Sequence, residues 1–185
     1  MESTNLHTAV FAGGCFWCTE AVFRMLKGVR SVDPGYTGGS VNAPSYEQVS
    51  SGGTGHAEAV RIQFDPAVIA YDDLLAVFFA THDPTSLNRQ GADVGTQYRS
   101  AVFAADEAQE VAAKQYIAAL DAASPGGAPI VTEVQRLTEF FPAEAYHKDY
   151  YERNPDAGYC QAVITPKVEK AKKRFAELLR DGAAG

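Results

Sequence analysis

Hydrophobic residues follow two alternating patterns along the chain. Short runs rich in valine, isoleucine, phenylalanine and tyrosine predict strands at residues 8–12, 29–36, 57–64, 100–104 and 130–137. Between these runs, apolar residues spaced three and four positions apart predict helices at residues 15–27, 71–81, 107–122 and 167–180. The alternation predicts an α/β protein whose helices pack on a mixed sheet.

Residues that favour helix ends and loops interrupt this pattern. Gly28 follows the first predicted helix, where a C-cap residue in the left-handed conformation is expected. Asp106 and, three residues later, Gln109 have the form of a capping box that opens the third helix. Long glycine-rich stretches, which usually carry function in a compact domain, lie at residues 37–55, 83–95 and 154–158.

Length and charge restrict the class of protein. A chain of 185 residues, 46% of them hydrophobic, predicts one domain over residues 1–185 with a full-sized core. The net charge is -7, and the longest basic cluster, residues 170–174, lies in a helical pattern, which argues against nucleic acid or an anionic membrane as partner. No apolar stretch is long enough to span a bilayer, and residues 1–7 lack a signal-peptide core, so we expect a cytoplasmic monomer.

The three cysteines are an odd number in a chain expected in a reducing compartment, which favours reactive or buried thiols over a disulfide framework. Two of them lie where the first predicted strand gives way to the first helix, in Gly13-Gly14-Cys15-Phe16-Trp17-Cys18-Thr19-Glu20. Unpaired amides and the helix dipole at this position favour the thiolate of Cys15, which is its reactive form. We therefore predict that Cys15 is a nucleophile beside an aromatic wall.

The sequence Gly14-Cys15-Phe16-Trp17 resembles that of the A-type peptide methionine sulfoxide reductases. Further stretches similar to that family follow in the same order, at Tyr46 and at residues 52–60, 82–85, 90–100 and 158–160. Each motif is weak alone, but five ordered matches between about residue 8 and about residue 175 are specific. Nearly the whole chain takes part in the resemblance.

The resemblance implies both a fold and an activity. The fold is a two-layer α/β sandwich with a mixed sheet, built on a ferredoxin-like core with long active-site loops over one end of the sheet. The activity is thiol-dependent reduction of methionine S-sulfoxide, free or within proteins, to methionine. No bound cofactor is expected, and thioredoxin or dithiothreitol would act as the external reductant.

Methionine sulfoxide requires a thiolate aimed at sulfur, an acid beside the oxygen and an apolar slot for the S-methyl group. Cys15 supplies the thiol, and Phe16 and Trp17 are suited to form the slot because aromatic faces pack well against methyl groups and sulfur. Glu58 lies in an apolar strand setting, where burial would raise its pKa and make it a proton donor near neutral pH. In the resembling family, these positions carry these roles.

Three further residues are expected to assist at the sulfoxide oxygen. Tyr46 and Tyr98 are neutral donors, and Asp93 is an acceptor for a tyrosine hydroxyl or an ordered water. These roles are also carried over from the resembling family. Taken singly, each of the three residues would more often be structural.

A second cysteine is needed because oxygen transfer leaves Cys15 as a sulfenic acid, which condenses with a nearby thiol. Cys160 follows residues 154–158, whose composition suggests a mobile loop, whereas Cys18 is held on the same helix as Cys15. We expect Cys160 to act as the recycling cysteine, with Cys18 as its competitor. Many family members carry glycine at the position of Cys18, so the chain departs from the family at this step.

Other classes of function remain open at this stage. A cysteine hydrolase or acyltransferase would pair Cys15 with His56, although we expect His56 to be a structural loop residue. A non-catalytic zinc module would use Cys15, Cys18, Cys160 and a histidine such as His147, but the sequence lacks a second closely spaced ligand pair and we expect no metal. A thioredoxin-like oxidoreductase is a third alternative, supported only by the Cys-x-x-Cys spacing.

Overall fold

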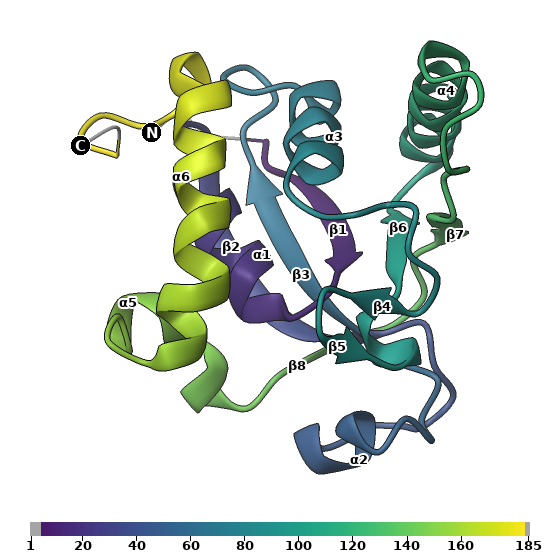
Figure 1. The fold of residues 1–185 in the computed structure, drawn as a ribbon, viewed down its shortest axis with the longest axis vertical. Helices are drawn as coiled ribbons and strands as arrows, with labels where there is room; N and C mark the ends of the chain where they lie inside the picture. Colours follow the sequence, from purple (N-terminus) through teal and green to yellow (C-terminus); the bar gives the residue numbers. More distant parts are fainter. Residues whose placement is uncertain (1–4, 184–185) are drawn as a thin grey trace.

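The computed structural model describes residues 5–183 and has a six-stranded sheet at its centre (Figure 1). The strands lie in the order β7-β6-β1-β3-β2-β8, and all neighbours are antiparallel except β6 and β7. Their bounds are β1 His7–Gly13, β2 Val29–Thr37, β3 Ala57–Phe64, β6 Ser100–Ala104, β7 Glu133–Arg136 and β8 Phe140–Pro142. A separate ribbon pairs β4, Arg89–Gln90, with β5, Asp93–Val94. The prediction of a mixed sheet is confirmed.

The middle of the sheet has the strand order of a ferredoxin-like fold. A β-α-β-β-α-β unit runs through β1, α1 (Phe16–Phe23), β2, β3, α3 (Tyr71–Ala80) and β6, and its strands lie in the order β6-β1-β3-β2. In the antiparallel pair of β1 and β3, Phe11 lies opposite Val60. The last residues of β1 therefore lie beside the first residues of β3, at one end of the sheet.

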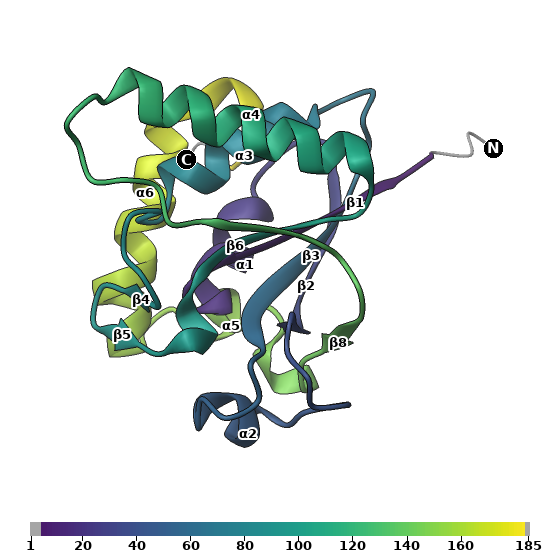
Figure 2. The same ribbon diagram turned by 90° about the vertical axis from the view of Figure 1, so that its right-hand side faces the viewer.

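Helices cover one face of the sheet, which gives the two layers expected. These are α1, α3, α4 (Glu107–Ala123) and α6 (Thr165–Arg174), and Figure 2 shows α4 crossing the top of the molecule beside α3. The main core lies under them, where the ring of Phe11 stacks on Phe23 at 5.5 Å and on Phe78 at 4.8 Å. Within residues 5–183, no helix is both long and apolar enough to cross a membrane.

The connections that lack regular structure gather at one end of the sheet, in the lower half of both views (Figures 1 and 2). They are the β2–β3 connection with α2 (Tyr46–Ser50), the α3–β6 connection with β4 and β5, and the segment from β8 through α5 (Tyr150–Arg153). This is the end of the sheet at which β1 finishes and β3 begins. The expected long loops over one end of the sheet are present.

The first helix is shorter than predicted. It ends at Phe23 because the chain then turns, and Leu26 forms a β-bridge with Leu179. Gly28 has the expected positive φ, 85°, but lies beyond this turn instead of capping the helix. Pairing with a segment remote in sequence therefore replaces the last turn of the predicted helix.

The last helix also differs from the prediction. α6 begins at Thr165 and ends at Arg174, and one π-helical turn, Cys160–Ile164, precedes it. Cys160, which the sequence predicts to follow a mobile loop, itself lies in this helical turn and is 0% exposed. The apolar side chains of Cys160 and Ile164 pack into the main core.

The predicted capping box of α4 is half formed. The Asp106 carboxylate accepts a hydrogen bond from the Gln109 amide at 2.9 Å, as expected for an N-cap. The Gln109 side chain, however, accepts from the Ala105 amide and donates to the Thr8 carbonyl. It therefore ties α4 to β1 instead of completing the box.

Gly14 joins β1 to α1 in a conformation that other residues rarely adopt. Its φ is 97°, and a Cβ atom at this position would lie 2.7 Å from Cγ of Gln90. Gln90 is 6% exposed, and its side chain accepts a hydrogen bond from the Asp83 amide at 3.0 Å, so it is not free to move away. The approach of the chain to Cys15 therefore requires glycine here.

We predict that Gly14→Ala lowers the free energy of unfolding by about 2–4 kcal/mol, through backbone strain together with overpacking. Gly126→Ala is the matched control, because Gly126 also has a positive φ, 83°, but nothing lies within 4 Å of its added Cβ. We expect about 1–2 kcal/mol for the control, from backbone strain alone. Urea unfolding followed by circular dichroism measures both values, and equal losses would show that the contact with Gln90 has no cost.

Candidate active site

Cys15 lies between the end of β1 and the first residue of α1. It is the N-cap residue of α1, with φ -56° and ψ 125°, and its carbonyl accepts from the Cys18 amide at 3.1 Å. Its side chain is 9% exposed. The position agrees with the sequence-based expectation of a thiol at the start of a helix.

Glu58 lies beside Cys15 because β3 begins next to the end of β1. Its Oε1 accepts a hydrogen bond from the Phe16 amide at 3.2 Å, and its Oε2 is buried without a hydrogen-bond partner. The residue is 1% exposed, and burial raises its pKa to about 8. Glu58 is therefore neutral at pH 7, and an unpaired carboxyl oxygen is present to carry the proton.

Aromatic rings surround this end of α1. Phe16 lies 5.0 Å from the His147 ring and 6.4 Å from the Tyr46 ring, and Trp17 stacks on Tyr150 at 3.7 Å. His147 also contacts Trp17, whose indole Nε1 donates to His147 Nδ1 at 3.1 Å. The structure thus brings Phe16, Trp17 and Tyr46 together, as the sequence predicted.

Tyr46 reaches this cluster through local sequence signals and one remote contact. Ser45 caps α2, forming the reciprocal capping box with Gln48. The Tyr46 amide donates to Glu144 Oε2 at 3.0 Å, which fixes the start of α2 against the segment that carries His147. Burial, together with the charge of Glu58, raises the pKa of Tyr46 to about 12, so its hydroxyl keeps its proton.

Tyr98 and Asp93 come from the α3–β6 connection. Burial is the largest cause that raises the pKa of Tyr98, and the charges of Glu58 and Asp93 raise it further. Asp93 Oδ2 accepts a hydrogen bond from the Tyr159 hydroxyl at 2.9 Å. The expected tyrosine partner of Asp93 is therefore Tyr159, which sequence reasoning did not select.

Cys15 and Cys18 influence each other across one turn at the helix start. Their interaction and burial raise the pKa of Cys15, while the interaction with Cys15 lowers the pKa of Cys18 to about 7. The Tyr159 hydroxyl lies 3.8 Å from the Cys18 sulfur. The helix dipole, which favours a thiolate at Cys15, is therefore opposed by burial and by the neighbouring Cys18.

His56 has no part in this cluster. Its Nδ1 accepts from the Gly39 amide at 3.0 Å, and its Nε2 bonds to the Val41 carbonyl at 2.6 Å, so both ring nitrogens hold the β2–β3 connection. This geometry agrees with the expected structural role and leaves no nitrogen to act as a base for Cys15. In the described part of the chain, no group of three or more His, Cys, Asp or Glu side chains is placed to bind a metal ion.

His147 is the residue that sequence reasoning placed only among zinc ligands. It is 0% exposed, and its Nε2 is buried without a partner among the described residues. Because Nδ1 accepts from Trp17, Nε2 carries the proton in the neutral ring. The only sequence signal near His147 was the adjacent aromatic residue Tyr146. An aromatic residue beside a histidine is too common a pattern to identify a site.

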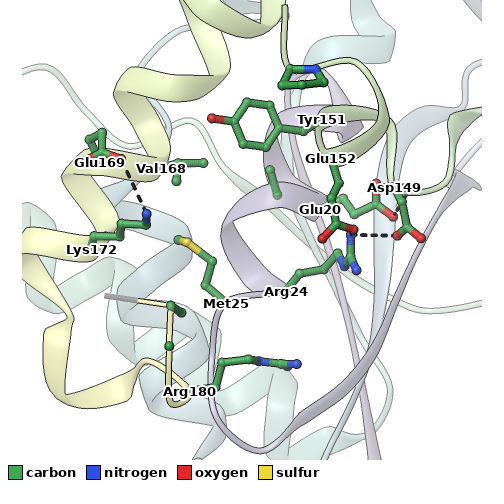
Figure 3. A pocket seen from close by; sticks show the side chains of 14 residues that line it. Glu20, Arg24, Met25, Asp149, Tyr151, Glu152, Val168, Glu169, Lys172 and Arg180 are labelled. Carbon is green, nitrogen blue, oxygen red and sulfur yellow. Dashed lines mark hydrogen bonds and ion pairs between the residues drawn. The ribbon is translucent and has the colours of Figure 1, made fainter. Parts of the chain in front are cut away.

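Away from the aromatic cluster, a cavity of about 510 Å³ lies along α1 and α6 (Figure 3). At its edge, both carboxylate oxygens of the buried Glu20 accept from the Asp149 amide, at 2.9 and 3.1 Å. Burial raises the pKa of Glu20 to about 7. Asp149 also pairs with Arg24 at 2.9 Å, as drawn in Figure 3. These contacts hold the segment that carries His147 and Tyr150 against α1.

Comparison with known proteins identifies relatives over almost the full chain. Residues 7–179 match the family described as "Peptide methionine sulfoxide reductase". "Peptide methionine sulfoxide reductase MsrA" of Deinococcus radiodurans is 57% identical over 172 residues, covering 93% of this chain and 84% of the relative. The protein of the same name from Chromobacterium violaceum is 54% identical over 176 residues, covering 95% of this chain and 100% of the relative.

A solved structure agrees with these relatives. The reduced form of Mxr1 from Saccharomyces cerevisiae superposes with a TM-score of 0.77 at 32% identity, covering 86% of this chain and 91% of the yeast chain. Sequence and fold therefore point to the same family, and the residues that match the family model include Cys15. From this agreement we conclude that the chain belongs to the peptide methionine sulfoxide reductase family.

Proposed function

We propose that this protein reduces the S-sulfoxide of methionine to methionine, in proteins and as the free amino acid. One observation carries the proposal: a neutral, buried carboxyl group with a free oxygen, Glu58, lies beside a buried cysteine at a helix start. A sulfoxide is attacked at sulfur only when its oxygen receives a proton. A neutral acid next to a thiol supplies that combination.

The first step transfers oxygen from the substrate to Cys15. Cys15 loses its thiol proton to solvent, and its sulfur forms a bond to the sulfoxide sulfur while the Glu58 Oε2 proton moves to the sulfoxide oxygen, assisted by the hydroxyls of Tyr46 and Tyr98. The hydroxyl then passes from the substrate sulfur to the Cys15 sulfur as the S–O bond and the new S–S bond break, so methionine leaves and Cys15 remains as a sulfenic acid. Glu58 regains a proton from solvent. Phe16 and Trp17 enclose the S-methyl group, and the free Nε2–H of His147 is a donor for the substrate.

The second step closes a disulfide. A thiol attacks the sulfenic sulfur, the hydroxyl leaves as water, and an external dithiol such as thioredoxin or dithiothreitol then reduces the disulfide. This chemistry needs no bound cofactor, because the electrons come from cysteines. Mxr1 of Saccharomyces cerevisiae is known in a complex with Trx2, which supports a thioredoxin as the reductant here. We also infer a cytoplasmic setting, where thiols are kept reduced.

We propose Cys18 as the attacking thiol. It lies one turn along α1 from Cys15, whose carbonyl accepts from the Cys18 amide at 3.1 Å, and its lowered pKa, about 7, provides a thiolate near neutral pH. Cys15 lies at the N-cap, outside the regular turns of α1, so the pair is not held at fixed helical positions. The sequence-based expectation favoured Cys160 on the ground of loop mobility, but the structure buries Cys160 in a helical turn.

Replacing the nucleophile tests the whole proposal. We predict that Cys15→Ser loses reduction of methionine S-sulfoxide, because a serine hydroxyl is a far weaker nucleophile toward sulfur than a thiol. The measurement is methionine release from N-acetyl-methionine S-sulfoxide with dithiothreitol, with circular dichroism to confirm the fold. Wild-type activity in this variant would refute the assignment.

Replacing the acid tests the first step. We predict that Glu58→Gln slows methionine release in a single turnover by a factor of about 10²–10⁴, the usual contribution of a positioned general acid. The exposed Glu47 neighbours Tyr46, so Glu47→Gln is a control that should keep the wild-type rate. Because the acid form of Glu58 acts, the wild-type rate should fall as pH rises through about 8, and Glu58→Gln should lack that fall. An unchanged profile in the variant would move the donor role to another group.

Single-cysteine variants test the second step. With thioredoxin as the reductant, we predict that Cys18→Ser releases about one equivalent of methionine and stops, whereas Cys160→Ser continues to turn over. Peptide mapping after one wild-type turnover without reductant should find Cys15 joined to Cys18. Cys15 joined only to Cys160 would instead support the sequence-based expectation, and would require the turn at Cys160–Ile164 to open.

A further inference from the structure

A cavity of about 470 Å³ opens directly beside Cys15. Its walls come from α6, the α3–β6 connection and Tyr159, whereas the aromatic cluster of Phe16, Trp17 and Tyr46 is not part of its lining. Lys167 and Lys170 of α6 line it, three residues apart on one helix face, together with Val163 of the preceding π-helical turn. We call this space the lysine cavity.

The two lysines of this cavity are not neutralised. Among residues 5–183, neither Lys167 nor Lys170 forms an ion pair, whereas Lys172 on the next turn pairs with Glu169 at 3.6 Å. Both residues line the cavity, and Lys167 is half-buried whereas Lys170 is exposed. Two unpaired cations side by side are notable in a chain of net charge -7.

The carboxylates that line the same cavity have other partners. Asp83 Oδ1 accepts from the amide and hydroxyl of Thr85, and Asp83 Oδ2 accepts from Ser86. Asp93 accepts from the Tyr159 hydroxyl. Both acidic groups thus bond to neutral donors, and neither forms an ion pair with Lys167 or Lys170 among the described residues, so the two ammonium groups remain available to an external anion.

The charge of Lys167 acts on two groups near Cys15. Burial and, to a smaller extent, the charge of Lys167 lower the pKa of His82 to about 4. The same charge also contributes to the lowered pKa of Cys18. Lys167 therefore acts electrostatically on groups around Cys15, as expected for an ammonium group that points into the cavity.

We propose that the lysine cavity binds a carboxylate of the substrate, so that the enzyme prefers methionine sulfoxide that has a carboxylate next to it. This inference rests on the proposed function and adds a substrate class to it. The carboxylate belongs either to an aspartate or glutamate beside the oxidised methionine, or to the α-carboxyl group of a C-terminal or free methionine sulfoxide. An ammonium–carboxylate pair in a partly shielded cavity gains charge-assisted hydrogen bonds that a neutral group does not.

Matched peptides test this preference. Acetylated and amidated peptides carry methionine S-sulfoxide with aspartate before or after it, and the reference peptides carry asparagine instead. Dithiothreitol is the reductant, so that docking of a protein reductant does not enter the measurement. We expect kcat/KM for at least one aspartate peptide to exceed its asparagine counterpart by about three- to tenfold at low salt, and the ratio to shrink at 0.5 M salt, where screening is strong.

The second arm uses the α-carboxyl group. N-acetyl-methionine S-sulfoxide carries a carboxylate, and its N-methylamide does not. A preference for the acid in this pair, without one in the peptides, identifies the terminal carboxylate as the ligand. A preference in the peptides alone identifies the acidic side chain as the ligand. Either preference supports the proposal provided that it is lost when the lysines are replaced.

The lysine variants establish that dependence. In Lys167→Gln/Lys170→Gln, the ratio for charged over neutral substrate should fall to about one, and Lys167→Glu should invert it. Lys173→Gln removes one charge from an exposed position of α6 outside the lysine cavity and should leave the ratio unchanged. Titration of the single tryptophan, Trp17, in the Cys15→Ser protein repeats the comparison without turnover.

The proposal that the lysine cavity binds a substrate carboxylate is overturned by either of two results. One is equal kcat/KM for charged and neutral substrates in the wild type, and the other is a preference that survives in the double variant. Either result would leave the proposed function standing, because methionine sulfoxide would still be reduced. Absence of any methionine release from the wild-type protein would instead overturn the proposed function.

Discussion

The site depends on one buried hydrogen bond, from the Phe16 amide to the carboxyl group of Glu58. This bond joins the first residue of α1 to the second residue of β3 and leaves one carboxyl oxygen without a partner. Burial keeps the group neutral, because an isolated charge in this setting is costly. The antiparallel pairing of β1 with β3 makes the bond possible, so the sheet register positions the acid relative to the thiol.

The remaining groups reach this point through connections that the sheet itself does not specify. Glu144 holds Tyr36 through its hydroxyl and Tyr46 through its amide, while Glu20 holds the Asp149 amide. Two buried or half-buried carboxylates thus attach the loop after β8 to the sheet and to α1. The aromatic cluster around His147 is rigid because its supports are hydrogen-bonded and not merely packed.

Much of the fold was predictable from the sequence, since periodicity is local and the strands 57–64 and 100–104 were found with correct bounds. The shortening of α1 was not, because the bridge from Leu26 to Leu179 is a remote contact. Resemblance located Cys15, Glu58 and Asp93, but no pattern shows which hydroxyl Asp93 accepts from. His147 and Tyr159 were missed for the same reason: their significance lies in partners far away in the chain.

The position of Cys18 bears on the durability of the protein as well as on its chemistry. A sulfenic acid that persists can be oxidised again to a sulfinic acid, which thiols do not reduce. Cys18 lies one turn of α1 from Cys15, and its amide donates to the Cys15 carbonyl at 3.1 Å, so its thiol is present at an effective concentration that no thiol in solution reaches. With Cys18 as the proposed attacking thiol, a neighbour three residues away would set the lifetime of the sulfenic acid and limit irreversible inactivation.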